Sequence, residues 1–312
     1  MIIDMHCDTI GKIMHEGNSE LKSNNLSVDI NKLKKGNSLA QFFAMFIYLE
    51  KNPKTFNRAM DMINVFYREI EKNSHDIAVA RNYKELMNNN KSGKISAFLT
   101  IEEGEAIEGS LKNLQNFYDL GVRLMTLTWN FENSIGFPNC RKEYMNKGLK
   151  AFGIETVERM NELGMIVDTS HLSDGGFWDV ARYSKKPFVA SHSNCRALCG
   201  HSRNLTDDMI KTLSEKGGIM GVNFEKSFLQ DEGKISSVDD MVRHMRRMYD
   251  KGGIDVIALG TDFDGIDSEN LEISNIGEMD KLIDKLKISG FKESDIDKIT
   301  KDNALRVIKE VL

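Results

Sequence analysis

The sequence has very little proline, little cysteine and no segment that separates one part of the chain from another. Only 3 of its 312 residues are proline, and no linker rich in proline, glycine or serine interrupts it. Its 4 cysteines are too few for the disulfide framework that stabilises small secreted domains. We therefore expect one domain spanning residues 1–312, with reduced thiols and a cytoplasmic location.

Long hydrophobic runs and an excess of basic charge are also missing. No uncharged apolar stretch approaches the roughly 18 residues that a membrane-spanning helix needs. The first residues, MIIDMHCDT, lack the basic and apolar regions of a signal peptide. Acidic residues outnumber basic ones by 47 to 42, so no basic surplus is available to neutralise a phosphate backbone. We expect neither a membrane anchor nor a nucleic-acid partner.

Short apolar, β-branched runs alternate with longer stretches of helical periodicity. Most of the runs are almost continuously apolar, which is typical of parallel strands covered on both faces. Such alternation predicts βαβ units and a parallel sheet. We expect strands at 2–9, 41–49, 94–102, 122–129, 164–171, 187–193, 217–224 and 256–265.

Eight such units predict an α/β fold, a single-domain (β/α)8 TIM barrel. A doubly wound open sheet is the alternative, but no glycine-rich phosphate loop follows the first run. Thr206 precedes two aspartates and is expected to cap a helix. The segment MNNNKSGK is expected to be a loop, and the C-terminal LRVIKEVL a short amphipathic tail.

Polar residues gather where the apolar runs end, which in a barrel is where active sites are built. The first run ends in His6, Cys7 and Asp8. Because strand side chains alternate between faces, His6 and Asp8 project to one side and Cys7 to the other. Such a pair can chelate a divalent metal such as Zn²⁺, although a hydrogen bond that orders the strand explains the spacing as well.

Further ligand-type residues end other runs. His171 and His192 end consecutive runs, and adjacent parallel strands are close enough for two imidazoles to share one metal. Either histidine alone would be interpreted as a core residue. Glu102 ends the third run and could bridge two ions through its two oxygens. The alternative is that Glu102 and Glu103 form a solvated turn.

Two more polar residues are candidates for catalysis and binding. Asp262, in GTDFDG, ends the last run, where a carboxylate beside a metal-activated water would carry the proton. Asp264 is expected in an Asx turn. Arg203, after the sixth run, suits a substrate carboxylate, although a helix cap or an ion pair fits nearly as well. Two further thiols are interpreted as packing residues: Cys195 and Cys199.

Together these segments resemble the renal (membrane) dipeptidase family, zinc peptidases of the amidohydrolase-like barrel superfamily. The matching motifs are DMHCDT, IEEGE, DTSHLS, ASHSN, RNLTDD and LGTDFDG, in the family's order. The resemblance implies two Zn²⁺ ions per chain. One would be held by His6, Asp8 and Glu102, and the other by Glu102, His171 and His192.

The resemblance also implies an activity, that of a metallo-dipeptidase. A hydroxide bridging the two zinc ions would attack the peptide bond of a dipeptide, Asp262 would carry the proton, and Arg203 would hold the substrate carboxylate. A related amidohydrolase acting on N-acyl amino acids, lactams or other small amides stays open, as does a metal-binding barrel without activity. Neither the preferred dipeptide nor a homodimer follows from the sequence.

Two positions depart from the family pattern. Renal members carry a histidine after Thr-Leu-Thr that helps hold the reacting carbonyl, whereas this chain has Trp129, which has an N–H donor but no basic nitrogen. Trp129 and Asn130 are therefore the candidate substrate-binding residues, with Asn133 as an alternative. The family's glutamate is commonly followed by two glycines, whereas Glu103 follows Glu102 here.

Overall fold

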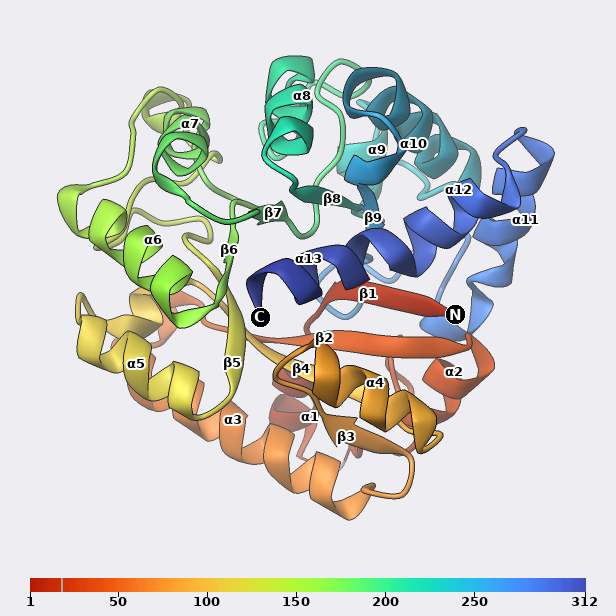
Figure 1. The fold of residues 1–312 in the computed structure, drawn as a ribbon, viewed down its shortest axis with the longest axis horizontal. Helices are drawn as coiled ribbons and strands as arrows, with labels where there is room; N and C mark the ends of the chain where they lie inside the picture. The colour runs from red at the N-terminus through yellow and green to blue at the C-terminus, as the bar shows by residue number, and fades with distance from the viewer. Residues whose placement is uncertain (18) are drawn as a thin grey trace.

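The computed structural model describes residues 1–17 and 19–312. Its parallel sheet closes on itself because β2 pairs with both β1 and β4. Eight strands form the resulting barrel, which confirms the predicted (β/α)8 fold (Figure 1). They are β1 (Ile2–Cys7), β2 (Ser38–Phe46), β4 (Ile95–Glu102), β5 (Val122–Thr126), β6 (Ile166–Asp168), β7 (Val189–Ala190), β8 (Ile219–Val222) and β9 (Ile257–Leu259).

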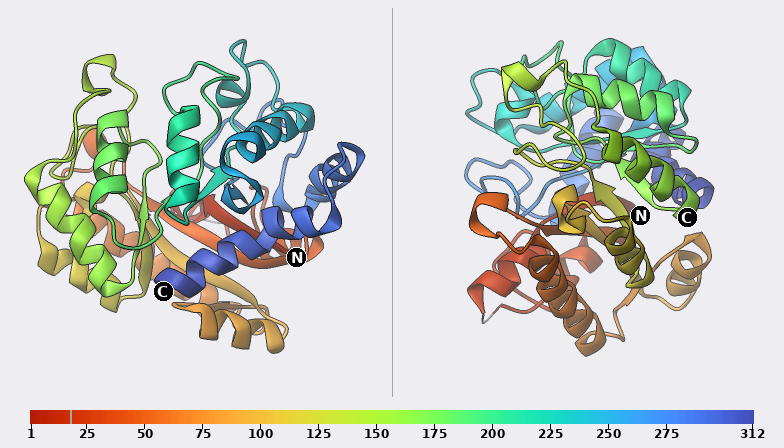
Figure 2. Two further views of the ribbon diagram at one scale, coloured as in Figure 1. Left: turned by 45° about the horizontal axis from the view of Figure 1, so that its top comes forward. Right: turned by 90° about the vertical axis from the view of Figure 1, so that its left-hand side faces the viewer.

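Helices surround this barrel (Figures 1 and 2). Six of them coincide with the stretches of helical periodicity between the predicted strands. They are α3 (Thr55–Lys72), α5 (Leu111–Asp119), α6 (Ala151–Leu163), α7 (Asp174–Tyr183), α8 (Asp207–Glu215) and α10 (Val238–Gly252). The others are α1 (Thr9–Glu16), α2 (Ile30–Lys35), α4 (Tyr83–Lys91), α9 (Lys226–Leu229), α11 (Asp280–Ile288), α12 (Glu293–Asp297) and α13 (Asn303–Val311). Thr206 caps α8 as predicted, since its hydroxyl accepts the N–H of Met209 at 3.3 Å. Across the described ranges, no helix is both long and apolar enough to cross a membrane.

Strand β3 and helix α4 were not predicted. Strand β3 (Ile77–Val79) pairs with the first half of β4, and α4 follows it and includes the start of MNNNKSGK. That segment is therefore not a loop throughout. The three residues of β3 are too few to show the alternation that identifies a strand.

The C-terminal residues form a closing helix, and interpreting them as a mere tail was wrong. Inside the barrel, inward-facing side chains such as Met5 and Phe98 form a compact apolar cluster, which α13 joins through Val307 and Val311. Lys186, just before β7, donates to the carbonyl of Val311 at 2.9 Å. Helix α13 therefore covers the N-terminal ends of the strands, where both chain termini lie (Figures 1 and 2).

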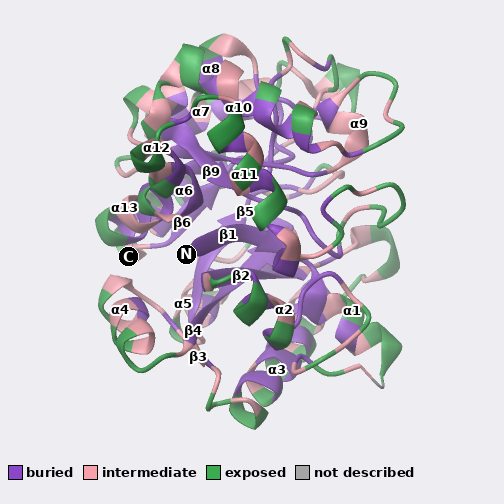
Figure 3. Ribbon diagram, turned by 90° about the vertical axis from the view of Figure 1, so that its right-hand side faces the viewer, coloured by how far each residue is buried: buried purple, intermediate pink, exposed green. Residues whose placement is uncertain are grey.

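A second apolar layer lies between the strands and the outer helices. Figure 3 shows buried strands and exposed residues on the outer faces of the helices. All four cysteines are free, and Cys195 and Cys199 are buried packing residues, as expected. With the N-terminal end closed by α13, the C-terminal ends of the strands are left to form the mouth of the barrel.

Candidate metal centre

A bulge in β1 directs His6 into the mouth of the barrel. The register of β1 against β2 shifts between Asp4 and Cys7. As a result, Met5 belongs to the inner cluster whereas Cys7 belongs to the outer layer, although strict alternation would place both on one face. His6 Nε2 lies 3.4 Å from Asp8 Oδ2. The structure thus brings His6 and Asp8 together on the side opposite Cys7.

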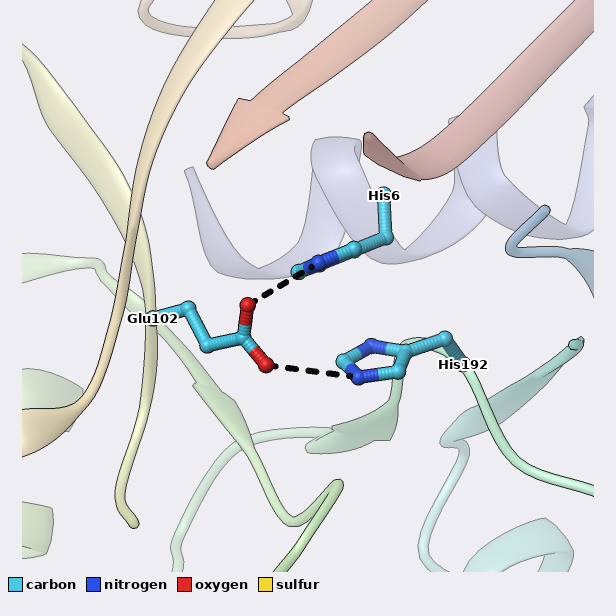
Figure 4. A group of neighbouring side chains, drawn as sticks. All are labelled: His6, Glu102 and His192. Carbon is cyan, nitrogen blue, oxygen red and sulfur yellow. Dashed lines mark ion pairs between the residues drawn. The ribbon is translucent and has the colours of Figure 1, made fainter. Parts of the chain in front are cut away.

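Glu102, the last residue of β4, directs one carboxylate oxygen toward each of two groups. Its Oε2 lies 3.2 Å from His6 Nε2. Its Oε1 lies 3.1 Å from His171 Nε2 and 3.6 Å from His192 Nε2. Figure 4 shows the carboxylate between His6 and His192. Glu102 and Glu103 are both buried, so the alternative of a solvated turn was wrong.

Hydrogen bonds indicate which nitrogen of each later histidine carries the proton. His171 Nδ1 lies 3.1 Å from the side-chain oxygen of Asn130, which can only accept, so Nδ1 carries the hydrogen. His192 Nδ1 lies 2.7 Å from Ser191 Oγ. The Ser191 hydroxyl donates to Asp168 Oδ2 at 2.6 Å, so it accepts from His192 Nδ1. Both histidines therefore present an unprotonated Nε2 to the barrel mouth.

Three acceptor atoms consequently converge without a hydrogen between them. His171 Nε2 and His192 Nε2 lie 3.1 Å apart, and both face Glu102 Oε1. Facing lone pairs repel in a buried site unless a cation lies among them. Among the described residues, the buried ring nitrogens of His6 and Oδ1 of Asp8 likewise have no hydrogen-bond partner. Imidazole and carboxylate are the ligands that zinc prefers, so these residues fit a metal centre.

The electrostatics of His171, His192 and Glu102 agree with that assignment, whereas His6 differs: although burial opposes it, the Glu102 and Asp8 carboxylates raise the pKa of His6 well above its ordinary value. Burial, with a contribution from the Arg203 charge, lowers the pKa of His171 to about 4. Burial and the neighbouring His6 hold the pKa of His192 well below its ordinary value. Although burial opposes it, the nearby histidines hold the pKa of Glu102 well below its usual range. His171 and His192 are therefore neutral and Glu102 is ionised, which are the protonation states that a metal ligand requires.

Asp262 is the third acidic residue at the metal centre, beside His6 and Asp8. Its Oδ1 lies 3.8 Å from His6 Nε2, and its Oδ2 accepts from the side chain of Asn223 at 2.8 Å. His6, Asp8 and Asp262 form one group whose ligand atoms lie within 4.8 Å of one another, and His6, Glu102 and His192 form another. Burial raises the pKa of Asp262 to about 8. Asn223 follows β8 with no sequence signal to identify it.

Left-handed backbone recurs at this mouth. Glu103, His171 and Asp262 have φ values of 98°, 68° and 62°. Such conformations cost on the order of 1 kcal/mol or more in residues other than glycine and concentrate at functional sites. Here they turn the chain sharply just beyond the strands and direct side chains into the mouth.

Glu103 anchors the loop after β5. Its carboxylate accepts the N–H of Trp129 at 2.9 Å and the side-chain amide of Asn133. The Asn133 side chain is thus hydrogen-bonded to Glu103, whereas Trp129 and Asn130 line the cavity. Of the two asparagines that could replace the family histidine, Asn130 is the one that faces the cavity.

The cavity above the metal ligands has a volume of about 660 Å³. One end is aromatic, since the Trp129 ring packs 4.8 Å from Phe46 and 5.1 Å from Tyr48, measured between ring centroids. Four basic side chains line the cavity as well: Lys12, His15, Lys51 and Arg58. A cavity of this size suits a small ligand with two side chains.

Arg203 and Asp264 lie differently from the other candidates. Arg203 is buried beside His192, donating to its carbonyl oxygen at 3.0 Å, and it is not among the residues that line the cavity. The Asp264 carboxylate accepts from the Thr9 hydroxyl at 2.6 Å and the Ser27 N–H at 2.7 Å. It therefore links its own loop to the start of α1 and to the segment that contains Ser27, instead of forming the expected Asx turn.

Known proteins resemble this chain in sequence. Residues 1–312 match the sequence model of the membrane dipeptidase family, peptidase family M19. A Klebsiella pneumoniae protein encoded in the pqqA 5′ region is 37% identical over 220 residues, covering 68% of this chain and 80% of that protein. A Schizosaccharomyces pombe protein named as a dipeptidase is 32% identical over 274 residues, covering 83% of this chain and 65% of that protein.

Solved structures give the same result. The crystal structure described as dipeptidase AC, a metallopeptidase of the same family, matches with a TM-score of 0.91 and 25% identity, covering 99% of this chain and 98% of that one. A Rhodobacter sphaeroides metallopeptidase, crystallised with a phosphinate mimic of L-Ala-D-Ala, matches with a TM-score of 0.90. At 24% identity, over 100% of this chain and 99% of that one, the second match is a likeness of fold.

Proposed function

The chain belongs to the membrane dipeptidase family and is a hydrolase of the metallopeptidase class, and we propose that it hydrolyses dipeptides with two bound zinc ions. The Glu102 carboxylate carries this proposal, because its two oxygens face separate groups of ligand atoms. One ion is assigned to His6, Asp8 and Glu102. The other is assigned to Glu102, His171 and His192.

The protein's own residues would position the substrate and move the proton. Zinc held by these residues would supply the nucleophile near neutral pH and would polarise the reacting carbonyl. Asp262 would take the proton from the nucleophile and return it to the leaving amine, since it lies beside His6 and is held by Asn223.

Binding of the substrate is assigned to Arg203, Trp129 and Asn130. Arg203 would hold the C-terminal carboxylate of the dipeptide, and its buried Nε has no hydrogen-bond partner among the described residues. Its charge acts on the cavity, since it contributes to the lowered pKa of His171. Trp129 and Asn130 would bound the space beside the reacting carbonyl.

A substrate panel tests the proposal. The zinc-loaded protein is assayed against L,L- and L,D-dipeptides and against N-acyl amino acids with the same C-terminal residues. We expect release of the C-terminal amino acid from dipeptides and no turnover of N-acyl compounds. Turnover confined to N-acyl compounds would instead indicate the related amidohydrolase activity, and two bound zinc ions without turnover would indicate a non-catalytic barrel.

A cytoplasmic location is part of the proposal. Cys140 is an exposed free thiol, which fits a reducing compartment. Fractionation of cells that produce the full protein, followed by detection with an antibody, measures the location directly.

A further inference from the structure

Asp168 is a buried carboxylate that lies outside the proposed metal-ligand set. It ends β6 and accepts four hydrogen bonds. Its Oδ1 accepts the N–H groups of Ser170 at 3.0 Å and Ser191 at 2.8 Å. Its Oδ2 accepts the hydroxyls of Thr126 and Ser191, both at 2.6 Å. These four donors occupy both oxygens of the carboxylate.

Ser191 connects this carboxylate to His192. The hydroxyl has a single hydrogen, and the charged oxygen of Asp168 is the strongest acceptor within its reach. Because its hydrogen is directed at Asp168, Ser191 Oγ must accept a hydrogen bond from His192 Nδ1, which lies 2.7 Å away. We propose that Asp168, acting through Ser191, is a positioning residue that fixes the tautomer of His192 and keeps its Nε2 available to the metal. The inference rests on the two-zinc site of the proposed function.

The competing tautomer shows why this connection is needed. His192 is fully buried, so water cannot compensate either nitrogen. Without the serine hydroxyl, Nδ1 would lose its acceptor, while Glu102 Oε1 lies 3.6 Å from Nε2. The proton would then be favoured on Nε2, where the carboxylate attracts it. A protonated Nε2 has no lone pair, so this tautomer cannot bind zinc.

The sequence offers a matched control for a test. Thr169 is also buried near the end of β6, and its hydroxyl donates to the carbonyl of Val189 at 2.9 Å, outside the connection to His192. Thr169→Val therefore removes a buried hydroxyl without touching the proposed path. Ser191→Ala removes the path, and Ser191→Thr restores a hydroxyl at the same position.

Zinc affinity is the primary measurement. Competition between the zinc-loaded protein and a chromogenic chelator should resolve two dissociation constants. In Ser191→Ala we expect one constant to rise about 10–100-fold and the other to stay unchanged, because partners of metal-binding histidines contribute affinity of that order. Thr169→Val should leave both unchanged, and Ser191→Thr should recover the lost affinity. After replacement of zinc by cadmium, cadmium NMR should show one shifted resonance in Ser191→Ala.

Several outcomes would overturn the inference. The inference would be wrong if both zinc dissociation constants of Ser191→Ala were within twofold of those of the unchanged chain. Another such outcome is an equal weakening of both constants in Ser191→Ala and Thr169→Val, which would indicate general damage to the barrel. Should Ser191→Ala fail to fold, Ser191→Cys keeps the volume with a weak acceptor and is measured in the same way. Because these measurements use no substrate, a protein that binds two zinc ions but hydrolyses no dipeptide contradicts the proposed function alone.

Discussion

His171 Nε2 and His192 Nε2 lie 3.1 Å apart, and the partners of their other ring nitrogens leave no hydrogen between them. Two unprotonated nitrogens in buried contact are what a shared metal requires.

This arrangement predicts the metal content of the protein. Elemental analysis of protein purified without a chelator should find about two zinc ions per chain. His171→Ala and His192→Ala should each lose one of them, because both serve the same ion. Full metal content and activity in both variants would show that these are core histidines.

The two adjacent glutamates should differ sharply. Glu102→Gln should abolish activity and weaken metal binding, because the charge shared between the two groups of ligands is lost. Glu103→Gln should retain zinc and much of the activity. It should lower the free energy of unfolding by about 1–3 kcal/mol, since one of the buried donors from Trp129 and Asn133 loses its acceptor. Zinc analysis, kinetics and urea unfolding of both variants check the ranking, and the reverse order would contradict the bridging role of Glu102.

Asp262→Asn separates proton transfer from metal binding. The amide keeps the shape of the side chain but cannot accept a proton at neutral pH. We expect kcat to fall by about 10²–10⁴-fold, the usual contribution of general acid–base catalysis. Zinc content should stay close to that of the unchanged chain. Loss of zinc in proportion to activity would show that Asp262 is a ligand, and full activity would show that the proton carrier lies elsewhere.

The basic side chains around the cavity predict a preference for acidic substrates. Carboxylates line the cavity as well, but each belongs to the metal centre or is engaged by neighbouring donors. Within the described ranges, Lys12, Lys51 and Arg58 line the cavity without forming an ion pair with a carboxylate. A dipeptide with a glutamate side chain should therefore bind better than its glutamine counterpart. Arg58→Met should raise KM for the glutamate substrate about fivefold, equivalent to ~1 kcal/mol, and leave the glutamine substrate unchanged. Arg68→Met, on the same helix beside Glu69, is the control. Equal effects on both substrates would refute the preference.

His244 predicts a stability change in mild acid. This residue of α10 is buried, its Nδ1 accepts the N–H of Cys195 at 3.0 Å, and its Nε2 lies 2.9 Å from the carbonyl of Leu229. Burial lowers its pKa from 6.5 to about 4. The unfolded chain therefore takes up this proton at a higher pH than the folded chain. The stabilisation is fully present above pH 6.5 and is lost as the pH falls toward 4, by about 3 kcal/mol at most.

Urea unfolding at several pH values checks that prediction. His244→Gln is the comparison, because glutamine keeps a donor for the Leu229 carbonyl and does not titrate. The difference in unfolding free energy between the two chains should narrow as the pH falls from 6.5 toward 4. A difference that is independent of pH would show that His244 does not contribute in this way. Acid-induced loss of zinc would affect both chains alike and cancels in the comparison.

Each of the eight predicted runs overlaps a strand of the barrel. The longest of them, β1, β2, β4 and β5, are easily recognised in the sequence as nearly continuous apolar runs, because both of their faces are covered. Strand β3 and helix α13 were missed for different reasons. Strand β3 has too few residues to show a period. Helix α13 has an apolar face whose partner, the interior of the barrel, exists only after the strands have closed.

The sequence by itself determined which residue types end the strands, and with them the candidate ligands and their order along the chain. Only the tertiary structure decided how these residues meet. The bulge that directs His6 inward, the burial of Glu103 and the path from Asp168 to His192 all depend on contacts between separate strands and loops. Local periodicity records which face of an element is covered. It does not record which distant residue covers it, because that choice is made when the barrel closes.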